Sequence, residues 1–154
     1  MEYIATLTDS IYFGKYPCDD VLNACIDLQI KTIVDLTHED DHLFPYTVPQ
    51  QMKKITFPIE DMSTAKDKPT LDFIKTCMES SKEGPLYIHC LGGHGRSGLI
   101  SAILYATLYE KSGEEALLAV KEAHAKRKTM HPKMRKLGSP QTKAQKKQVM
   151  RLCS

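Results

Sequence analysis

Long apolar runs are lacking in this chain of 154 residues. The longest, Leu99 to Leu108, is interrupted by Ser101 and Tyr105 and is too short to cross a bilayer. The first residues also lack the basic start of a secretory signal peptide. We therefore expect a protein without a transmembrane segment that is located in the cytoplasm, with the nucleus as the alternative.

Disulfide and metal-binding patterns are lacking as well. Five is an odd number of cysteines, and this favours a reducing compartment over a disulfide-stapled scaffold. The histidines show no metal-ligand spacing with the cysteines, so we predict neither a metal nor a cofactor. Cys18, Cys25, Cys77 and Cys153 are interpreted as small apolar side chains, or as including one that traps an oxidised Cys90 as a disulfide.

Acidic side chains are missing from the last fifth of the chain. Residues 123–154 contain ten lysines and arginines and no aspartate or glutamate, whereas residues 1–122 contain eleven basic and nineteen acidic side chains. One interpretation of this basic C-terminal segment is a solvated helical face. The other is docking to an acidic partner, a membrane or, less favoured, a nucleic acid.

Short apolar segments alternate with helix-forming ones along the chain. Strands are predicted at 11–14, 31–36, 55–57 and 86–88, and helices at 20–28, 70–80, 99–108, 112–128 and 139–152, with a surface loop at 38–50. The alternation predicts an α/β fold, with a mainly parallel sheet of about five strands and helices on both faces. Without a repeat or a linker, residues 1–154 suit one domain.

The run His89-Cys90-Leu91-Gly92-Gly93-His94-Gly95-Arg96-Ser97-Gly98 joins a predicted strand to a predicted helix. Its glycines let the backbone curl until successive N–H groups point inward. The helix that follows adds unpaired N–H groups and the positive end of its dipole. We therefore predict an anion-binding phosphate loop made of Leu91, Gly92, Gly93, His94, Gly95 and Arg96.

Three side chains of this run predict chemistry on a bound phosphate. Cys90 lies at the mouth of the loop, where N–H dipoles and a guanidinium favour the nucleophilic thiolate. Arg96 offers a planar fork that matches two phosphate oxygens. Ser97 can donate its hydroxyl to the sulfur when the thiolate leaves again. A covalent cysteinyl-phosphate is the expected intermediate.

The pattern His-Cys-x-x-Gly-x-Gly-Arg-Ser-Gly resembles the signature of the cysteine-dependent protein tyrosine phosphatases, in their small dual-specificity branch. The loop and its flanks are most similar to kinase-associated phosphatases, and the resemblance covers nearly the whole chain. It implies metal-independent hydrolysis of phosphotyrosine in proteins, and of phosphoserine or phosphothreonine. The tyrosine-selective enzymes are larger and frame a deep slot, so this short chain predicts a shallow, permissive pocket.

A phosphatase of this kind also needs a carboxylic acid on a separate loop to protonate the leaving oxygen. Asp61 matches the acid position of the family in the segment Pro58-Ile59-Glu60-Asp61. The family often has a proline soon after this aspartate, but here Pro69 comes later. Asp67 is therefore the alternative acid, and Glu60 is a third candidate.

The resemblance assigns supporting roles to His89 and Gln145. His89 is expected to orient the loop rather than to transfer protons. Gln145, on the last predicted helix, is expected to help place the hydrolytic water, with an ordinary surface glutamine as the alternative. His94 occupies a position where phosphatases of lipid phosphates usually carry lysine, which argues against phosphoinositide selectivity.

Other functions on the same residues stay as alternatives. An RNA 5′-phosphatase would suit the basic C-terminal segment, and a phosphoinositide phosphatase shares the scaffold. A phosphate-binding module without catalysis is disfavoured because Cys90, Arg96 and Ser97 are all present. A rhodanese-like sulfur transferase is disfavoured by the separate acid loop. We therefore predict a phosphatase whose partner is a phosphorylated protein substrate.

Overall fold

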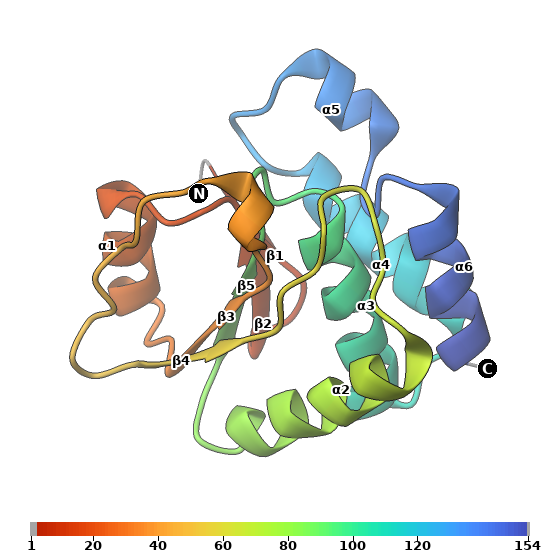
Figure 1. Ribbon diagram of the computed structural model, residues 1–154, viewed down its shortest axis with the longest axis horizontal. Coiled ribbons are helices and arrows are strands. Elements are labelled where there is room, and N and C mark those ends of the chain that lie inside the picture. Colours follow the sequence, from red (N-terminus) through yellow and green to blue (C-terminus); the bar gives the residue numbers. More distant parts are fainter. Residues whose placement is uncertain (1–2, 154) are drawn as a thin grey trace.

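The computed structural model describes residues 3–153. They form a central sheet with helices on both sides (Figure 1). The elements in chain order are β1 (Ile4–Thr6), β2 (Ile11–Gly14), α1 (Asp19–Asp27), β3 (Thr32–Asp35), the 3₁₀ turn η1 (Glu39–Asp41), β4 (Lys53–Thr56), α2 (Asp67–Ser81), β5 (Leu86–His89), α3 (Arg96–Tyr109), α4 (Gly113–Ala125), α5 (Pro132–Leu137) and α6 (Lys143–Leu152). No helix among these residues is both long and apolar enough to span a membrane.

The five strands lie in the order β1-β2-β5-β3-β4. All neighbours are parallel except β1, which pairs antiparallel with β2. Every residue of β2, β3 and β5 is buried, as expected for parallel strands that are covered on both faces. The predicted α/β fold with a mainly parallel five-stranded sheet is confirmed.

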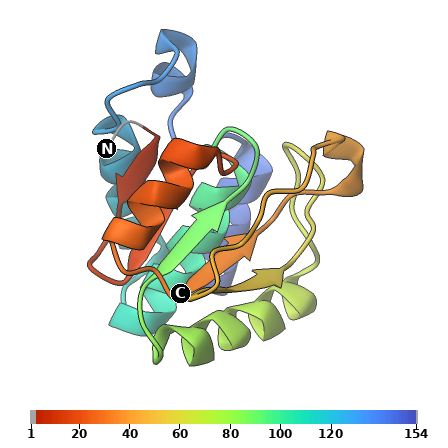
Figure 2. The same ribbon diagram turned by 90° about the vertical axis from the view of Figure 1, so that its left-hand side faces the viewer.

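The two faces of the sheet carry separate apolar cores. Helix α1 covers one face with Val21 and Cys25, while α2, α3, α4 and α6 cover the other (Figure 2). Helix α3 is apolar all round, and its residues from Arg96 to Leu104 are buried. The start of α3 is therefore fixed beyond the end of β5, where the phosphate loop connects the two.

The structure corrects several predicted elements. Strand β1 and helix α5 were not predicted, because β1 has three residues and α5 has no buried residue and hence no apolar periodicity. Helix α2 begins at Asp67 rather than at residue 70. The last helix begins after Thr142, whose side chain caps it in a reciprocal box with Gln145. Helix α4 begins after Ser112, whose side chain caps it in a reciprocal box with Glu115.

Candidate active site

The phosphate loop lies beyond the carboxyl end of β5, between β2 and β3, where parallel sheets bind ligands. Gly93 has a φ of +78°, and a Cβ added there would lie 2.2 Å from the backbone of Gly14. Only glycine fits this left-handed and crowded position. The chain just after β2 therefore forms one wall of the loop, and the N–H of Tyr16 donates to the Leu91 carbonyl at 2.9 Å.

Every carbonyl from Cys90 to Gly95 accepts a hydrogen bond from outside the loop. The donors, in order, are the His89 ring, the Tyr16 N–H, the Arg127 guanidinium for both Gly92 and Gly93, the Ser139 hydroxyl and the Leu99 N–H. Within residues 3–153, no backbone N–H of residues 91–95 donates to another group of the chain. These N–H groups are thus left to bind an anion.

Cys90 and Ser97 meet as the sequence predicts. The Sγ of Cys90 lies 3.4 Å from the hydroxyl oxygen of Ser97, and both residues are buried. Ser97 is the second residue of α3, so this contact joins the end of β5 to the start of the helix. A hydroxyl at this distance can donate to a sulfur that carries negative charge.

Arg96 is buried and held along one edge of its guanidinium. Its Nη1 donates to Asp41 Oδ2 at 2.8 Å and to the Ile59 carbonyl at 2.9 Å. Its Nη2 lies 3.3 Å from Asp61 Oδ1, and its buried Nε has no hydrogen-bond partner within the described residues. The Nε and Nη2 edge can therefore take two oxygens of a phosphate once Asp61 withdraws.

Asp41, which orients Arg96, was missed by the sequence analysis. It ends the turn η1, where its carboxylate also accepts the N–H of His38 at 2.8 Å. Burial alone would raise the pKa of Asp41, but the hydrogen bonds from Arg96 and His38 outweigh it and lower the pKa. The run Glu39-Asp40-Asp41 was the only signal in the sequence, and it does not differ from a solvated acidic loop.

The acid loop, residues 57–66, brings Asp61 and not Asp67 to Arg96. The side chain of Asp61 is 60% exposed, so it can reach a bound substrate. Asp67 starts α2, where Arg151 holds its two oxygens at 2.8 Å each and Gln148 donates at 3.1 Å. These hydrogen bonds lower the pKa of Asp67 to about 2. Glu60 is exposed and lies beside Asp61 in the chain.

His89 is fully buried behind Cys90. Its Nδ1 lies 3.1 Å from the Cys90 carbonyl oxygen, and its Nε2 lies 2.7 Å from the Tyr46 hydroxyl. Because a carbonyl only accepts, Nδ1 carries the proton and Nε2 accepts from Tyr46. Burial lowers the pKa of His89, despite the opposing charge of Asp35. His89 thus links the Cys90 carbonyl to the Tyr46 hydroxyl.

Gln145 is buried, so its interpretation as a surface glutamine is wrong. Its Oε1 accepts the N–H groups of Gln141 and Thr142, both at 3.1 Å, and its Nε2 donates to the Ser63 carbonyl at 3.2 Å. A Cβ added at Gly95 would lie 3.0 Å from that Nε2. Gln145 therefore contacts both the acid loop and the phosphate loop.

His94 is paired with a second histidine on α4. Its Nδ1 lies 2.8 Å from Nε2 of His124, and Arg127 lies close to both rings. Burial, together with the charge of Arg127, lowers the pKa of His94 to about 4 and that of His124 to about 3. Near pH 7 the rim of the loop thus carries a neutral histidine, which does not replace a lysine charge.

Arg127 is the second functional residue that the sequence analysis missed. It is 4% exposed, and its guanidinium lies 2.9 Å from the Gly93 carbonyl oxygen and 3.3 Å from that of Gly92. The Arg135 guanidinium in turn donates to the carbonyl of Arg127 at 2.7 Å. Arg127 belongs to the basic C-terminal segment, whose charge excess hides a buried arginine among exposed ones.

The remaining cysteines are free thiols. Burial raises the pKa of Cys25 and Cys77 to about 12 and that of Cys153 to about 11. Thiols of this kind are inert, which supports their interpretation as small apolar side chains. That one of the cysteines traps an oxidised Cys90 stays a prediction.

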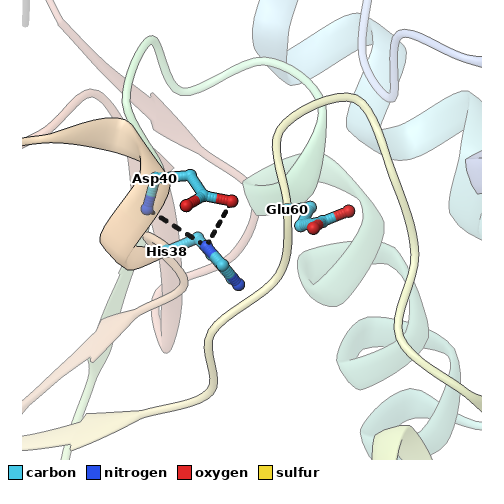
Figure 3. Close-up of side chains that lie close together, drawn as sticks. All are labelled: His38, Asp40 and Glu60. Atoms are coloured by element: carbon cyan, nitrogen blue, oxygen red, sulfur yellow. Dashed lines mark hydrogen bonds and ion pairs between the residues drawn. The ribbon is translucent and has the colours of Figure 1, made fainter.

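His38, Asp40 and Glu60 form a cluster in which ligand atoms lie within 4.8 Å of one another (Figure 3). The Nδ1 of His38 already accepts the N–H of Asp40 at 3.1 Å, which caps the turn η1. Asp40 and Glu60 are exposed, and exposed acidic groups often gather without a cation. This cluster does not decide whether the protein binds a metal, and the absence of a metal stays a prediction.

Comparisons with known proteins identify the same family. Residues 15–149 match the family model PTP-SAK, described as "Swiss Army Knife protein, DSP-PTPase phosphatase domain". "Putative tyrosine phosphatase 197R" of Invertebrate iridescent virus 6 is 33% identical over 141 residues, covering 86% of this chain and 47% of that protein. The dual specificity protein phosphatase TpbA of Pseudomonas aeruginosa (strain UCBPP-PA14) is 28% identical over 97 residues, covering 63% and 43%.

The chain spans about half the length of these curated relatives. The crystal structure of Tk-PTP in the active form has the same fold, with a TM-score of 0.77 and 21% identity over 97% of this chain and 95% of that one. The match over most of the chain confirms the resemblance expected from the phosphate loop. The chain belongs to the DSP-PTPase domain family, in the small dual-specificity branch of the cysteine-dependent protein tyrosine phosphatases.

Proposed function

We propose that this protein is a phosphatase that hydrolyses phosphotyrosine in proteins, and also phosphoserine and phosphothreonine, through a cysteinyl-phosphate. The observation that carries the proposal is the orientation of the phosphate loop. All its carbonyls from Cys90 to Gly95 are bound from outside, so its N–H groups and the Nε edge of Arg96 are left for a phosphate. A nucleophilic sulfur begins the same loop.

In the first step, the thiolate of Cys90 attacks phosphorus. The sulfur–phosphorus bond forms as the bond to the leaving oxygen breaks, and Asp61 donates its proton to that oxygen. The loop N–H groups and the two-pronged edge of Arg96 hold the oxygens on which charge develops. In the structure, Asp61 Oδ1 lies 3.3 Å from Arg96 Nη2. When phosphate takes its place on Arg96, the Asp61 carboxyl group is released toward the leaving group.

In the second step, water attacks phosphorus and the sulfur leaves as a thiolate. Asp61, now a carboxylate, takes the proton of the water, and Ser97 donates a hydrogen bond to the sulfur at the 3.4 Å contact. One N–H of the Gln145 amide holds the Ser63 carbonyl, and the other is left to orient the water. No metal or cofactor enters either step.

We assign residues 1–154 to one catalytic domain, a phosphorylated protein as its substrate, and the cytoplasm as its location. The neutral state of His94 supports protein substrates over phosphoinositides, because the pKa of about 4 leaves no added cation at the rim. The acid is Asp61 because Asp67 is bound by Arg151 and Gln148.

A substrate panel tests this function. Phosphotyrosyl and phosphothreonyl peptides, a phosphoinositide and a 5′-triphosphorylated RNA are compared by initial rates of phosphate release. We expect the phosphopeptides to have the highest kcat/KM, inhibition by vanadate, and no effect of EDTA. A preference for RNA or lipid would contradict the proposed substrate, and full loss of activity in EDTA would contradict the mechanism.

A further inference from the structure

A groove of about 470 Å³ lies between α4, α5 and α6, outside the catalytic site. Its walls include Leu118 and Lys121 from α4, Arg135, Lys136 and Leu137 from α5, and Lys146 from α6. Helix α5, which forms one side, stands away from the body of the protein and has no buried residue (Figure 1). A six-residue helix that buries nothing of its own is available to a binding partner.

The charge of the groove is of one sign. Four of its ten lining residues are basic and none is acidic. Arg135 is occupied by the backbone carbonyls of Ala125 and Arg127. Within residues 3–153, Lys121, Lys136 and Lys146 make no ion pair, although six other basic side chains pair with carboxylates. The groove therefore offers three uncompensated cations to an acidic group.

The groove also exposes apolar side chains. Leu118 of α4 is 56% exposed and Leu137 of α5 is 44% exposed, and both line the groove. Two leucines between lysines suit a polypeptide with an apolar side chain flanked by carboxylates. A nucleic acid backbone has the negative charge but no aliphatic group to pack against these leucines, so the observations favour a protein.

The groove meets the phosphate loop from outside. Ser139 lines the groove, and its hydroxyl donates to the His94 carbonyl. Arg135 lines it as well and holds the carbonyl of Arg127, whose guanidinium binds the Gly92 and Gly93 carbonyls. Because the groove borders the phosphate loop, we take its occupant to be a segment of the substrate close to the phosphorylated residue.

We infer that the groove between α4, α5 and α6 is a docking site for an acidic segment, with one apolar side chain, of the phosphorylated protein substrate. Glutamates or aspartates of that segment pair with Lys121, Lys136 and Lys146, and the apolar side chain lies between Leu118 and Leu137. This inference rests on the proposed function for the identity of the substrate. The binding itself does not depend on catalysis.

Direct binding tests the site without turnover. A fluorescein-labelled, unphosphorylated peptide with glutamates on both sides of a leucine is titrated with the protein and followed by anisotropy. Exposed charge pairs contribute modestly, so the triple variant Lys121→Glu, Lys136→Glu, Lys146→Glu should weaken binding on the order of tenfold or more. A matched triple variant, Lys133→Glu, Lys143→Glu, Lys147→Glu, has the same net charge and should bind like the parent.

One further variant and two further probes sharpen the binding test. Leu118→Gln should weaken the leucine peptide but not a peptide with alanine in place of leucine. An equal loss of peptide affinity in both triple variants would show that net charge alone attracts the peptide, and it would overturn the groove as the docking site. Tighter binding of a single-stranded RNA that displaces the peptide would overturn the choice of a protein segment. The triple variant at Lys121, Lys136 and Lys146 is called the groove variant. If the parent protein associates with itself and the groove variant does not, the occupant of the groove is a second copy of this chain, and the docking of substrate is overturned.

Kinetics separate this inference from the proposed function. A phosphotyrosyl peptide extended by the acidic segment should have a several-fold lower KM than the unextended peptide, with an unchanged kcat. The groove variant should remove only that difference and hydrolyse p-nitrophenyl phosphate normally. A protein that binds the acidic peptide but hydrolyses no phosphopeptide would overturn the function and not the site. Equal KM values for both peptides would overturn the docking of substrate.

Discussion

The phosphate loop and the acid loop differ in how the protein holds them. In the phosphate loop, each carbonyl from Cys90 to Gly95 is bound from outside, so its geometry is set before substrate arrives. The acid loop is anchored on both sides of Asp61, at Ile59 and Ser63, but the Asp61 side chain between them is exposed. Anion binding is thus preorganised, whereas the proton donor can change partner.

Cys90→Ser should have the largest effect and should separate binding from chemistry. A serine hydroxyl fits the loop but does not ionise near neutral pH, so we expect no measurable turnover and nearly unchanged binding of tungstate or phosphate. Activity assays and calorimetric titration measure the two quantities. As a control, Cys18→Ser should keep full activity, because serine is a good residue at that helix N-cap. Normal hydrolysis by Cys90→Ser would rule out the covalent intermediate.

Asp61→Asn tests the acid loop, in which the Asp61 side chain is exposed. It should slow phosphotyrosyl peptides by on the order of 10²–10⁴-fold, because a positioned general acid contributes this much. Substrates with very acidic leaving groups should be slowed far less, since they leave without a proton. The matched variant Asp67→Asn should be mild on both classes. A leaving-group-dependent defect in Asp67→Asn alone would move the acid from Asp61 to Asp67.

Arg127→Met tests the phosphate loop by removing the side chain that donates to the Gly92 and Gly93 carbonyls. The buried Gly93 carbonyl and the partly buried Gly92 carbonyl lose their partner. An unsatisfied buried group costs about 1–3 kcal/mol, so kcat/KM should fall about 10–100-fold. Vanadate affinity should fall in parallel, because the loop N–H groups lose their common direction. Arg127→Lys should recover part of both quantities. A lower melting temperature with unchanged vanadate affinity would show that Arg127 only stabilises the fold.

The smallest effect concerns the His94 and His124 pair under acid. Their pKa values of about 4 and about 3 lie below the ordinary 6.5, so the unfolded chain takes up protons first as the pH falls. The stability that the neutral pair gives is full above about pH 6.5 and is lost as the pH falls to about 4 for His94 and about 3 for His124. Unfolding in urea should show a loss of about 2 kcal/mol between pH 7 and pH 5, solvent screening included.

A variant isolates this contribution. The double change His94→Leu, His124→Leu removes both titrating rings, so its stability should fall less between pH 7 and pH 5 than that of the parent. The measurement compares free energies of unfolding at the two pH values in each protein. Equal pH dependence in parent and variant would show that other groups set the acid sensitivity.

The sequence predicts the part of the site that is contiguous in the chain. Cys90, Arg96 and Ser97 lie within eight positions, and their geometry follows from a strand, a glycine-rich turn and a helix start. Asp61 came from the family resemblance, and the structure places it beside Arg96. The alternation of strands and helices predicts the parallel sheet, because buried parallel strands read as continuous apolar runs.

The sequence does not predict contacts that long-range packing creates. Asp41 lies 55 positions from Arg96, and Arg127 lies 34 positions from Gly93. Each belongs to a stretch of like charges, and nothing in the sequence distinguishes the residue that is held in the site from its exposed neighbours. Helix α5 was missed for a related reason, because a helix without an apolar face carries no periodic signal.

Three of the outer donors of the phosphate loop come from parts of the chain that are distant in sequence: Tyr16 after β2, Arg127 after α4, and Ser139 before α6. A folding intermediate with only β5 and α3 in place would have the cysteine and the arginine but no fixed direction for the peptide groups between them. Phosphatase activity should therefore appear in one cooperative step with the last helices. During unfolding, activity should then report on the packing of these distant segments, and a partly folded chain should give little unselective hydrolysis.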